Sequence, residues 1–163
     1  MAKNLFQGVC AFPLTPLRDQ HIDEAAFTAL LARLTDAGVD ALGVLGSTGS
    51  YAYLTREERA RITRLAVENA GDTPVMVSIG ALRLDDILYL ADDAQRAGVS
   101  GVMLAPVSYQ TPTQDEAFRL YERVTAALSV PLCVYENVPT TGFTFSDELL
   151  TQVARLPGVG AIK

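Results

Sequence analysis

The chain has 163 residues, the usual length of one domain, and 49% of them are hydrophobic, so it can bury a large core. The formal net charge is −6 and no basic run or basic-aromatic patch is present, so nucleic acid is not expected as a partner. No apolar stretch approaches the roughly 18 residues of a membrane span, so a membrane partner is not expected either.

Six short apolar runs recur along the chain and are predicted to be β-strands. In chain order they are GVCAF (8–12), ALGVLG (41–46), PVMVSIG (74–80), GVMLAP (101–106), PLCVYEN (131–137) and GVGAIK (158–163). Runs that are apolar throughout are typical of strands buried on both faces, as in parallel sheets.

The longer segments between these runs are predicted to be helices. Their apolar residues recur at helical spacing: Phe27, Leu30, Leu31 and Leu34; Ile62, Leu65 and Ala66; Leu84, Ile87, Leu88 and Ala91. Two capping boxes, Thr55–Glu58 and Thr113–Glu116, mark helix starts, and Ser146 can cap a fifth helix. Gly38, Gly71 and Gly98 each follow an alanine where a helix should end, because glycine tolerates the left-handed conformation there.

Apolar strands that alternate with amphipathic helices indicate parallel βα units. A spacing near 30 residues per unit favours a (β/α)8 TIM barrel, in which eight units take about 250 residues. On this interpretation, residues 1–163 are a single barrel domain, truncated after strand six, with about the first six strands and five helices. An open six-stranded sheet is the alternative fold.

Hydroxyl groups and one amine follow the predicted strands. Ser47 and Thr48 come after the second strand, Tyr109 comes after the fourth, Tyr135 lies at the end of the fifth, and Lys163 ends the sixth. The carboxyl ends of parallel strands carry the chemistry in both barrels and open sheets. We therefore expect these side chains to gather at one site.

Lys163 is the candidate nucleophile. Burial at the end of an apolar strand would disfavour its charged form and lower its pKa from about 10.4. A neutral amine can attack a ketone and form a Schiff base, whose iminium group then accepts electrons from a neighbouring C–C bond. This chemistry needs no metal and no cofactor.

Tyr135 is the candidate proton-transfer group, because Schiff-base formation needs a donor and acceptor within reach of the amine. The GSTG turn at 46–49 offers backbone N–H groups and two hydroxyls that could hold a carboxylate. Gly43, Gly46 and Gly49 could instead belong to a dinucleotide loop, but the second glycine falls one residue late for that fingerprint.

These residues, in this order, resemble the dihydrodipicolinate synthase / N-acetylneuraminate lyase family of class I aldolases. GSTGS is similar to the family's GTTGE loop, YENVPTTG to its YN-x-P-x-x-TG segment, and GVGAIK to the strand that ends in the Schiff-base lysine. The likeness runs collinearly from FQGVCAFPLTPL to Lys163.

The resemblance implies a (β/α)8 barrel, a homotetramer or dimer, that acts on pyruvate or a larger 2-oxo acid, with an aldehyde as possible second substrate. It implies Lys163 as Schiff-base former, Tyr135 as proton shuttle, and Ser47 and Thr48 as carboxylate-binding hydroxyls. Thr48 would also join the proton relay, to which Tyr109 would be contributed by a neighbouring subunit.

Two positions depart from the family pattern. Ser50 replaces the glutamate after the GSTG turn. Thr140, a candidate substrate-binding residue, stands where dihydrodipicolinate synthases usually carry an arginine, and a threonine offers no charge for a bidentate contact. A related aldolase or lyase that acts on another 2-oxo acid is therefore an open alternative.

Two other functions are also open: a non-catalytic barrel that binds a 2-oxo acid, and a nicotinamide oxidoreductase. Cys10 and Cys133 lie far apart in apolar runs, so we expect buried free thiols in a reducing compartment. The N-terminal stretch lacks a signal-peptide cleavage pattern, and together these features predict a cytoplasmic protein.

Overall fold

The computed structural model describes residues 4–163 and contains a six-stranded parallel sheet. The strands are β1 (Cys10–Ala11), β4 (Ala41–Val44), β5 (Val75–Ser78), β6 (Gly101–Leu104), β7 (Leu132–Val134) and β8 (Val159–Ile162). Each lies within one of the six apolar runs, so all six predicted strands are confirmed. Residues 1–3, at the start of the N-terminal stretch that lacks a signal-peptide pattern, lie outside the described range.

Five helices of two turns or more connect the strands. They are α1 (Glu24–Asp36), α2 (Arg56–Asn69), α3 (Leu84–Ala97), α4 (Gln114–Thr125) and α6 (Asp147–Ala154). Two short helical turns were not predicted: η1 (Tyr51–Tyr53) and α5 (Val138–Thr141). Both follow the carboxyl end of a strand and shape the connection there.

The helix ends follow the predicted capping signals. Thr55 and Thr113 each form a complete capping box, and the Ser146 hydroxyl accepts a hydrogen bond from Leu149 N. Gly38, Gly71 and Gly98 all have positive φ, between 55° and 86°, just beyond a helix.

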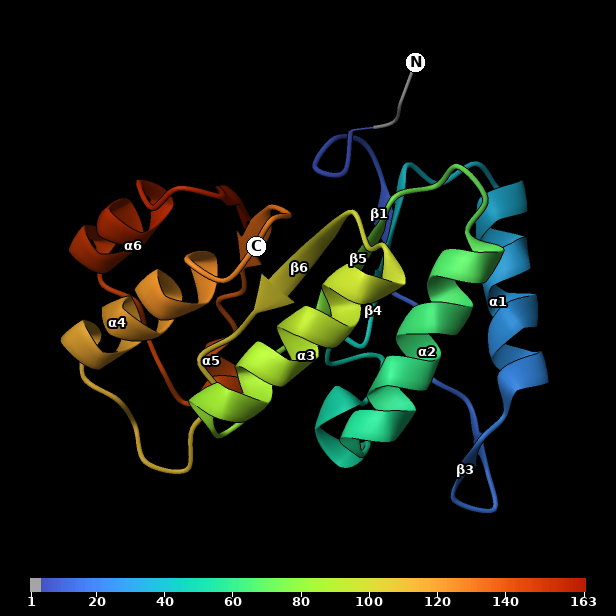
Figure 1. Ribbon diagram of the computed structural model, residues 1–163, viewed down its shortest axis with the longest axis horizontal. Coiled ribbons are helices and arrows are strands. Elements are labelled where there is room, and N and C mark those ends of the chain that lie inside the picture. Colours follow the sequence, from blue (N-terminus) through green and yellow to red (C-terminus); the bar gives the residue numbers. More distant parts are fainter. Residues whose placement is uncertain (1–3) are drawn as a thin grey trace.

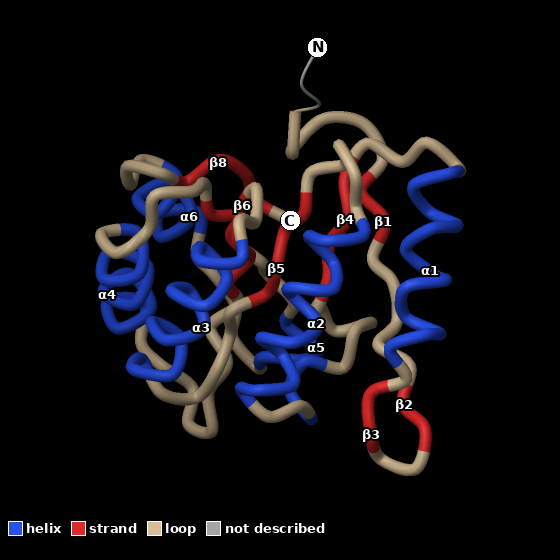
Figure 2. Tube along the Cα trace, turned by 45° about the vertical axis from the view of Figure 1, so that its right-hand side comes forward, coloured by secondary structure: helices blue, strands red, loops and turns tan. Residues whose placement is uncertain are grey.

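The strand order across the sheet is β1-β4-β5-β6-β7-β8, which follows the chain without a reversal. The helices form an arc on one side of the strands (Figures 1 and 2). A doubly wound open sheet instead reverses its strand order and carries helices on both faces. Sequential order with helices on one face is the arrangement of a barrel wall.

Side chains alternate between the two faces of this wall. On the helix side, Val102 and Leu104 of β6 join a large core with the helices. On the other face, Met103 packs in a smaller cluster with Cys133 and Tyr135. This inner face of the wall carries the side chains that reach the candidate site.

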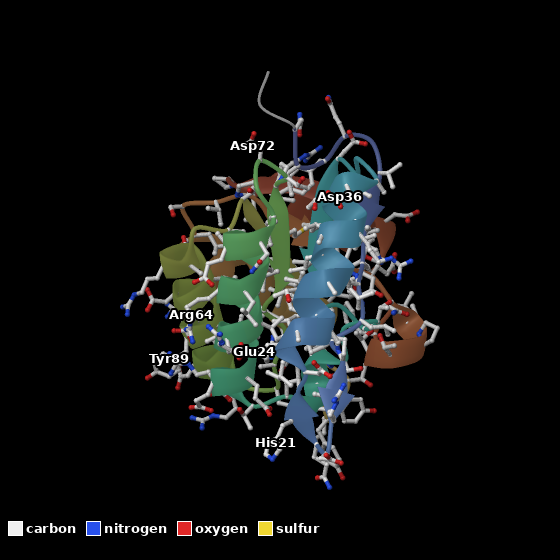
Figure 3. All side chains as sticks on the ribbon, turned by 90° about the vertical axis from the view of Figure 1, so that its right-hand side faces the viewer. His21, Glu24, Asp36, Arg64, Asp72 and Tyr89 are labelled. Carbon is white, nitrogen blue, oxygen red and sulfur yellow. The ribbon has the colours of Figure 1, made fainter. Side chains whose placement is uncertain are left out.

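A hairpin of β2 (Leu17–Arg18) and β3 (His21–Ile22), which was not predicted, follows β1. Asp19 and Gln20 form its turn with φ values of 50° and 65°. His21, the sole histidine, lies on this exposed hairpin (Figure 3). It does not line the site described below.

The two outer strands of the sheet, β1 and β8, each pair with one neighbour only within residues 4–163. Val9, next to β1, and Ile162 in β8 are accordingly exposed. None of the helices in the described part of the chain has the length and apolarity to cross a membrane.

Candidate active site

A cavity of about 120 Å³ lies at the carboxyl ends of the strands. It is lined by Phe12, Gly46, Ser47, Thr48, Met103, Tyr135 and Lys163. Five different strands or their extensions therefore supply its walls. Four of the residues predicted from the sequence meet here: Ser47, Thr48, Tyr135 and Lys163.

Strand alternation places Tyr135 and Lys163 on the same face. Cys133 of β7 pairs with Ala161 of β8, and both side chains belong to the inner cluster. Tyr135 and Lys163 each lie two residues further along, so their side chains point to the same inner face. Backbone hydrogen bonds keep this register, because Lys163 N donates to Val134 O at 2.8 Å and Glu136 N donates to Lys163 O at 2.9 Å.

The amine of Lys163 lies against two aromatic rings. Its Nζ is 4.1 Å from the ring centroid of Tyr135 and 5.0 Å from that of Phe12. The expectation that burial removes this amine from water is wrong for the described structure, where Lys163 is exposed. Within residues 4–163, β8 pairs with β7 alone, so its other side is uncovered there.

The Tyr135 phenol is buried and hydrogen-bonded. Asn137 Nδ2 donates to its oxygen at 2.6 Å, and Ser47 Oγ lies 3.4 Å from it. Burial opposes loss of the phenol proton. The hydrogen bonds with Ser47 and Asn137 and the positive charge of Lys163 outweigh burial and lower the pKa of Tyr135 below its usual value. A phenol with a lowered pKa exchanges protons more readily near neutral pH.

The turn after β4 holds Ser47 and Thr48 in a constrained backbone. Leu45 has a φ of 57°, unusual for a leucine, and turns the chain sharply at the strand end. A Cβ at Gly49 would lie 2.9 Å from Leu45 N, so only glycine fits. Thr15 Oγ1 donates to Gly49 O at 2.8 Å and ties this turn to the segment after β1. The turn is thus a rigid platform for two hydroxyl groups.

Two of the predicted site residues do not line the cavity. Tyr109 follows β6 and is 94% exposed. Thr140 lies in α5, and its hydroxyl donates to Asn137 O at 3.1 Å. Within this chain, therefore, Thr140 supports the backbone of α5 and does not line the cavity.

Three residues at the site were missed from the sequence. Phe12 and Met103 line the cavity as apolar residues in apolar strands, so no local signal distinguishes them from other core residues. Asn137 contacts the phenol of Tyr135. Its position two residues after Tyr135, in the YEN sequence, was the one signal that could have indicated this contact.

The two thiols near the site are free, but Cys10 is only half-buried. Burial raises the pKa of Cys133 to about 11, although the charge of Lys163 opposes this. Burial likewise raises the pKa of Cys10. Protonated thiols are poor nucleophiles, so neither cysteine is a candidate nucleophile at this site.

Two other kinds of site fit the structure less well. No three His, Cys, Asp or Glu side chains within residues 4–163 lie together as metal ligands would. The glycines of the β4 turn lead into the three-residue 3₁₀ turn η1 and do not open an α-helix, because α2 begins only at Arg56. A dinucleotide fingerprint needs a helix N-terminus directly after its glycines.

A larger cavity of about 510 Å³ lies between η1, α2 and the segment after β5. Its walls include the guanidinium of Arg59, which already donates to Ser78 O and Gly80 O. The Arg59 guanidinium lies 5.1 Å from the ring centroid of Tyr51 in the same cavity, but a guanidinium is always charged and does not form a Schiff base. Among the described residues, no lysine lines this cavity. We therefore assign the candidate active site by its chemistry and not by its volume.

The sequence is similar to a known family along almost its whole length. Residues 5–163 match the Dihydrodipicolinate synthetase family. Two 4-hydroxy-tetrahydrodipicolinate synthases are 34% identical over 165 residues (Phenylobacterium zucineum) and 36% identical over 163 residues (Salinibacter ruber). They match 100% and 98% of this chain and 56% and 54% of their own lengths. The chain thus spans about half the length of the curated relatives it matches.

Solved structures agree with this match. A dihydrodipicolinate synthase from Agrobacterium tumefaciens superposes with a TM-score of 0.94 at 49% identity, over 97% of this chain and 54% of that one. A prophage protein of the same family from E. coli K12, solved in complex with pyruvate, superposes with a TM-score of 0.92 at 28% identity, over 98% and 55% of the two chains. The prediction that the six strands belong to a (β/α)8 barrel is confirmed.

Proposed function

Because this chain belongs to the Dihydrodipicolinate synthetase family, we propose that it is part of a class I aldolase or lyase that uses Lys163 to form a Schiff base. The substrate is pyruvate or another 2-oxo acid. The reaction proceeds without a metal or an organic cofactor. The observation that carries the proposal is the position of Lys163 Nζ, 4.1 Å from the Tyr135 ring centroid at the carboxyl ends of the strands.

The first steps take place between the amine and the keto group. Neutral Lys163 adds to the carbonyl carbon and gives a carbinolamine, which loses water to form an iminium ion. Tyr135 accepts and returns the protons that these steps move. Its buried position and lowered pKa support this role.

The next steps use the iminium ion as an electron acceptor. Loss of a proton from the carbon next to it gives an enamine, which adds to the carbonyl carbon of an aldehyde. In the reverse direction, cleavage of the C–C bond releases the aldehyde and leaves the enamine, which takes up a proton at carbon and becomes the iminium ion again. Water then hydrolyses the imine and frees Lys163 for another turnover.

The substrate carboxylate binds at the turn after β4. Ser47 and Thr48 line the cavity with Lys163, and their hydroxyls can donate to carboxylate oxygens. The rigid backbone around Gly49 supports this role, because a fixed donor loses little entropy on binding. Thr140 carries no charge, so the second substrate need not be the one that an arginine at this position would bind.

Assembly is a further part of the proposal. Tyr109 is too exposed to act within its own chain, and we propose that it completes the proton relay with Thr48 of a neighbouring copy in a homotetramer or dimer. We also propose that residues 1–163 form part of one barrel domain. The free thiols suit a cytoplasmic location.

Borohydride reduction in the presence of pyruvate tests the proposal directly. The iminium ion is reduced to a stable amine, and mass spectrometry of peptides should find the added mass on Lys163. Lys3 is the only other lysine of this chain, so Lys3→Arg is a matched control that should keep the label. No label on folded wild-type protein would refute the proposal.

The same material separates the alternatives. A non-catalytic barrel would be stabilised by pyruvate but would show no turnover with any aldehyde of a broad panel. A nicotinamide oxidoreductase would shift or quench the fluorescence of NADH on mixing, and we expect no change. The aldehyde panel also identifies the second substrate and the favoured direction.

A further inference from the structure

The shortest hydrogen bond to the Tyr135 phenol comes from Asn137, whose Nδ2 donates at 2.6 Å. We infer that Asn137 is a positioning residue, which occupies one side of the phenol oxygen and so directs the phenol's own hydrogen into the cavity. The inference rests on the proposed function and adds to it a residue that determines where the O–H bond of the phenol points.

The backbone of Asn137 is held firmly in place. Its carbonyl oxygen accepts hydrogen bonds from the backbone N–H groups of Thr140 and Thr141, both at 3.0 Å. The hydroxyls of the same two threonines also donate to it, both at 3.1 Å. Four donors on one carbonyl fix the backbone at the start of α5, from which the side-chain amide of Asn137 reaches the phenol.

The chemistry of the amide nitrogen sets the direction of the phenol hydrogen. An amide NH₂ group can donate hydrogen bonds but cannot accept them. The phenol hydrogen must therefore point away from Asn137. The remaining neighbours of the phenol are Ser47 Oγ, at 3.4 Å, and the amine of Lys163, and both line the cavity. The proton is thus presented where a carbinolamine on Lys163 would form.

The charged and titratable groups around the phenol are few. Lys163 faces it from the end of β8. Tyr51 in η1 interacts with the phenol electrostatically. The pKa of Tyr51 is raised mainly by burial and, to a smaller extent, by the neighbouring Tyr135. Cys10 of β1 and Cys133 of β7 belong to the same inner cluster, and burial raises the pKa of both thiols. None of these groups duplicates the hydrogen bond from Asn137.

Two substitutions in the full-length, assembled protein test the inference. Asn137→Ala removes the donor and should lower kcat about 10-fold, the worth of one good hydrogen bond. Asn137→Asp keeps the shape but accepts a hydrogen bond, so it should turn the phenol hydrogen away from the cavity and lower kcat about 100-fold. Asn69→Asp makes the same chemical change on α2, outside the site, and should leave kcat unchanged.

The order of the two effects distinguishes positioning from packing. If Asn137 only filled space, the isosteric aspartate would be the milder change, whereas the inference requires it to be the more severe. NMR titration of tyrosine ring carbons, assigned with Tyr135→Phe, should also show the pKa of Tyr135 raised in both variants, more in Asn137→Asp. KM for pyruvate should stay within about twofold, because Asn137 does not line the cavity.

The inference and the proposed function fail in different ways. An unchanged Tyr135 titration and an unchanged pH profile of kcat in both variants, with borohydride labelling of Lys163 intact, would overturn the role of Asn137 alone. Absence of labelling in the wild-type protein would overturn the Schiff-base mechanism, and the tyrosine titration would still decide whether Asn137 controls the phenol. If Asn137→Asp does not fold, Asn137→Ala alone suffices. An unchanged kcat and an unchanged pKa of Tyr135 in Asn137→Ala would then refute the inference.

Discussion

The side-chain nitrogen of Lys163 lies over the ring of Tyr135, 4.1 Å from its centroid. The two residues end neighbouring parallel strands and share one face of the barrel wall. A cation over an aromatic ring is stabilised by the ring's negative face. The same charge favours the ionised form of the phenol and contributes to the lowered pKa of Tyr135.

Removal of this charge should raise the pKa of Tyr135. In Lys163→Met the phenol loses a neighbouring cation that stabilises its ionised form, so ionisation should require a higher pH. Ultraviolet difference titration of tyrosinate, compared with Tyr135→Phe, measures the change. Arg155→Met removes an exposed charge at the end of α6 and should not move the titration. An equal pKa in Lys163→Met and wild type would contradict the contact.

Loss of the phenol hydroxyl should slow turnover far more than binding. We expect Tyr135→Phe to lower kcat by about 10²–10⁴-fold, the usual effect of losing an acid–base group. Borohydride labelling of Lys163 should persist with slower kinetics, because the amine is still present. Tyr89→Phe, on the exposed face of α3, is the matched control and should retain wild-type kcat.

The pH profile should carry the signature of this phenol. Its pKa is lower than usual, so the protonated form that donates a proton is lost at a lower pH than for an ordinary tyrosine. The alkaline limb of the kcat profile should therefore move to higher pH in Asn137→Ala, where the pKa rises. Steady-state rates across the pH range, under saturating pyruvate, provide the measurement.

The turn after β4 should determine affinity for the carboxylate. Ser47→Ala removes one hydroxyl from the cavity wall and should raise KM for pyruvate about 10-fold, the cost of one hydrogen bond to a charged group. Ser129→Ala, at the opposite end of the sheet before β7, should have no effect on KM. Equal KM values for both variants would place the carboxylate elsewhere.

The backbone of this turn should not tolerate a side chain at Gly49. A Cβ there would lie 2.9 Å from Leu45 N and 3.0 Å from Leu45 Cα, and backbone atoms cannot move aside easily. Gly49→Ala should lower the free energy of unfolding by about 1–3 kcal/mol and raise KM for pyruvate. At Gly46 the nearest atom belongs to the Phe12 side chain, at 3.1 Å, so Gly46→Ala should cost less. Urea denaturation of the two variants gives the comparison.

Arg59 should stabilise the end of β5. It is 6% exposed, and its guanidinium donates to Gly80 O at 3.0 Å and Ser78 O at 2.9 Å. Arg59→Met leaves both buried carbonyls without this donor and should lower the free energy of unfolding by about 2–4 kcal/mol. Arg64 lies on the exposed surface of the same helix (Figure 3), and Arg64→Met should change stability by less than about 0.5 kcal/mol.

The sequence by itself determined the elements and much of the site. Apolar runs and capping boxes are local signals, so the six strands and five long helices could be predicted from neighbouring residues alone. The order of the predicted strands then placed Tyr135 and Lys163 at the carboxyl ends of two successive strands. Those ends lie at the same edge of the sheet, because the strands are parallel. The family resemblance added the expected role of each residue.

Tertiary structure alone decided how these groups meet. The contact between Asn137 and the phenol depends on α5, a turn of four residues with no periodic signal. The position of Lys163 Nζ over the Tyr135 ring depends on the pairing of β7 with β8, which no residue near Lys163 encodes. Phe12 and Met103 become cavity walls only when β1 and β6 curve around one face. Local patterns specify backbone elements, whereas the distances and coverage that govern reactivity arise from residues far apart in the chain.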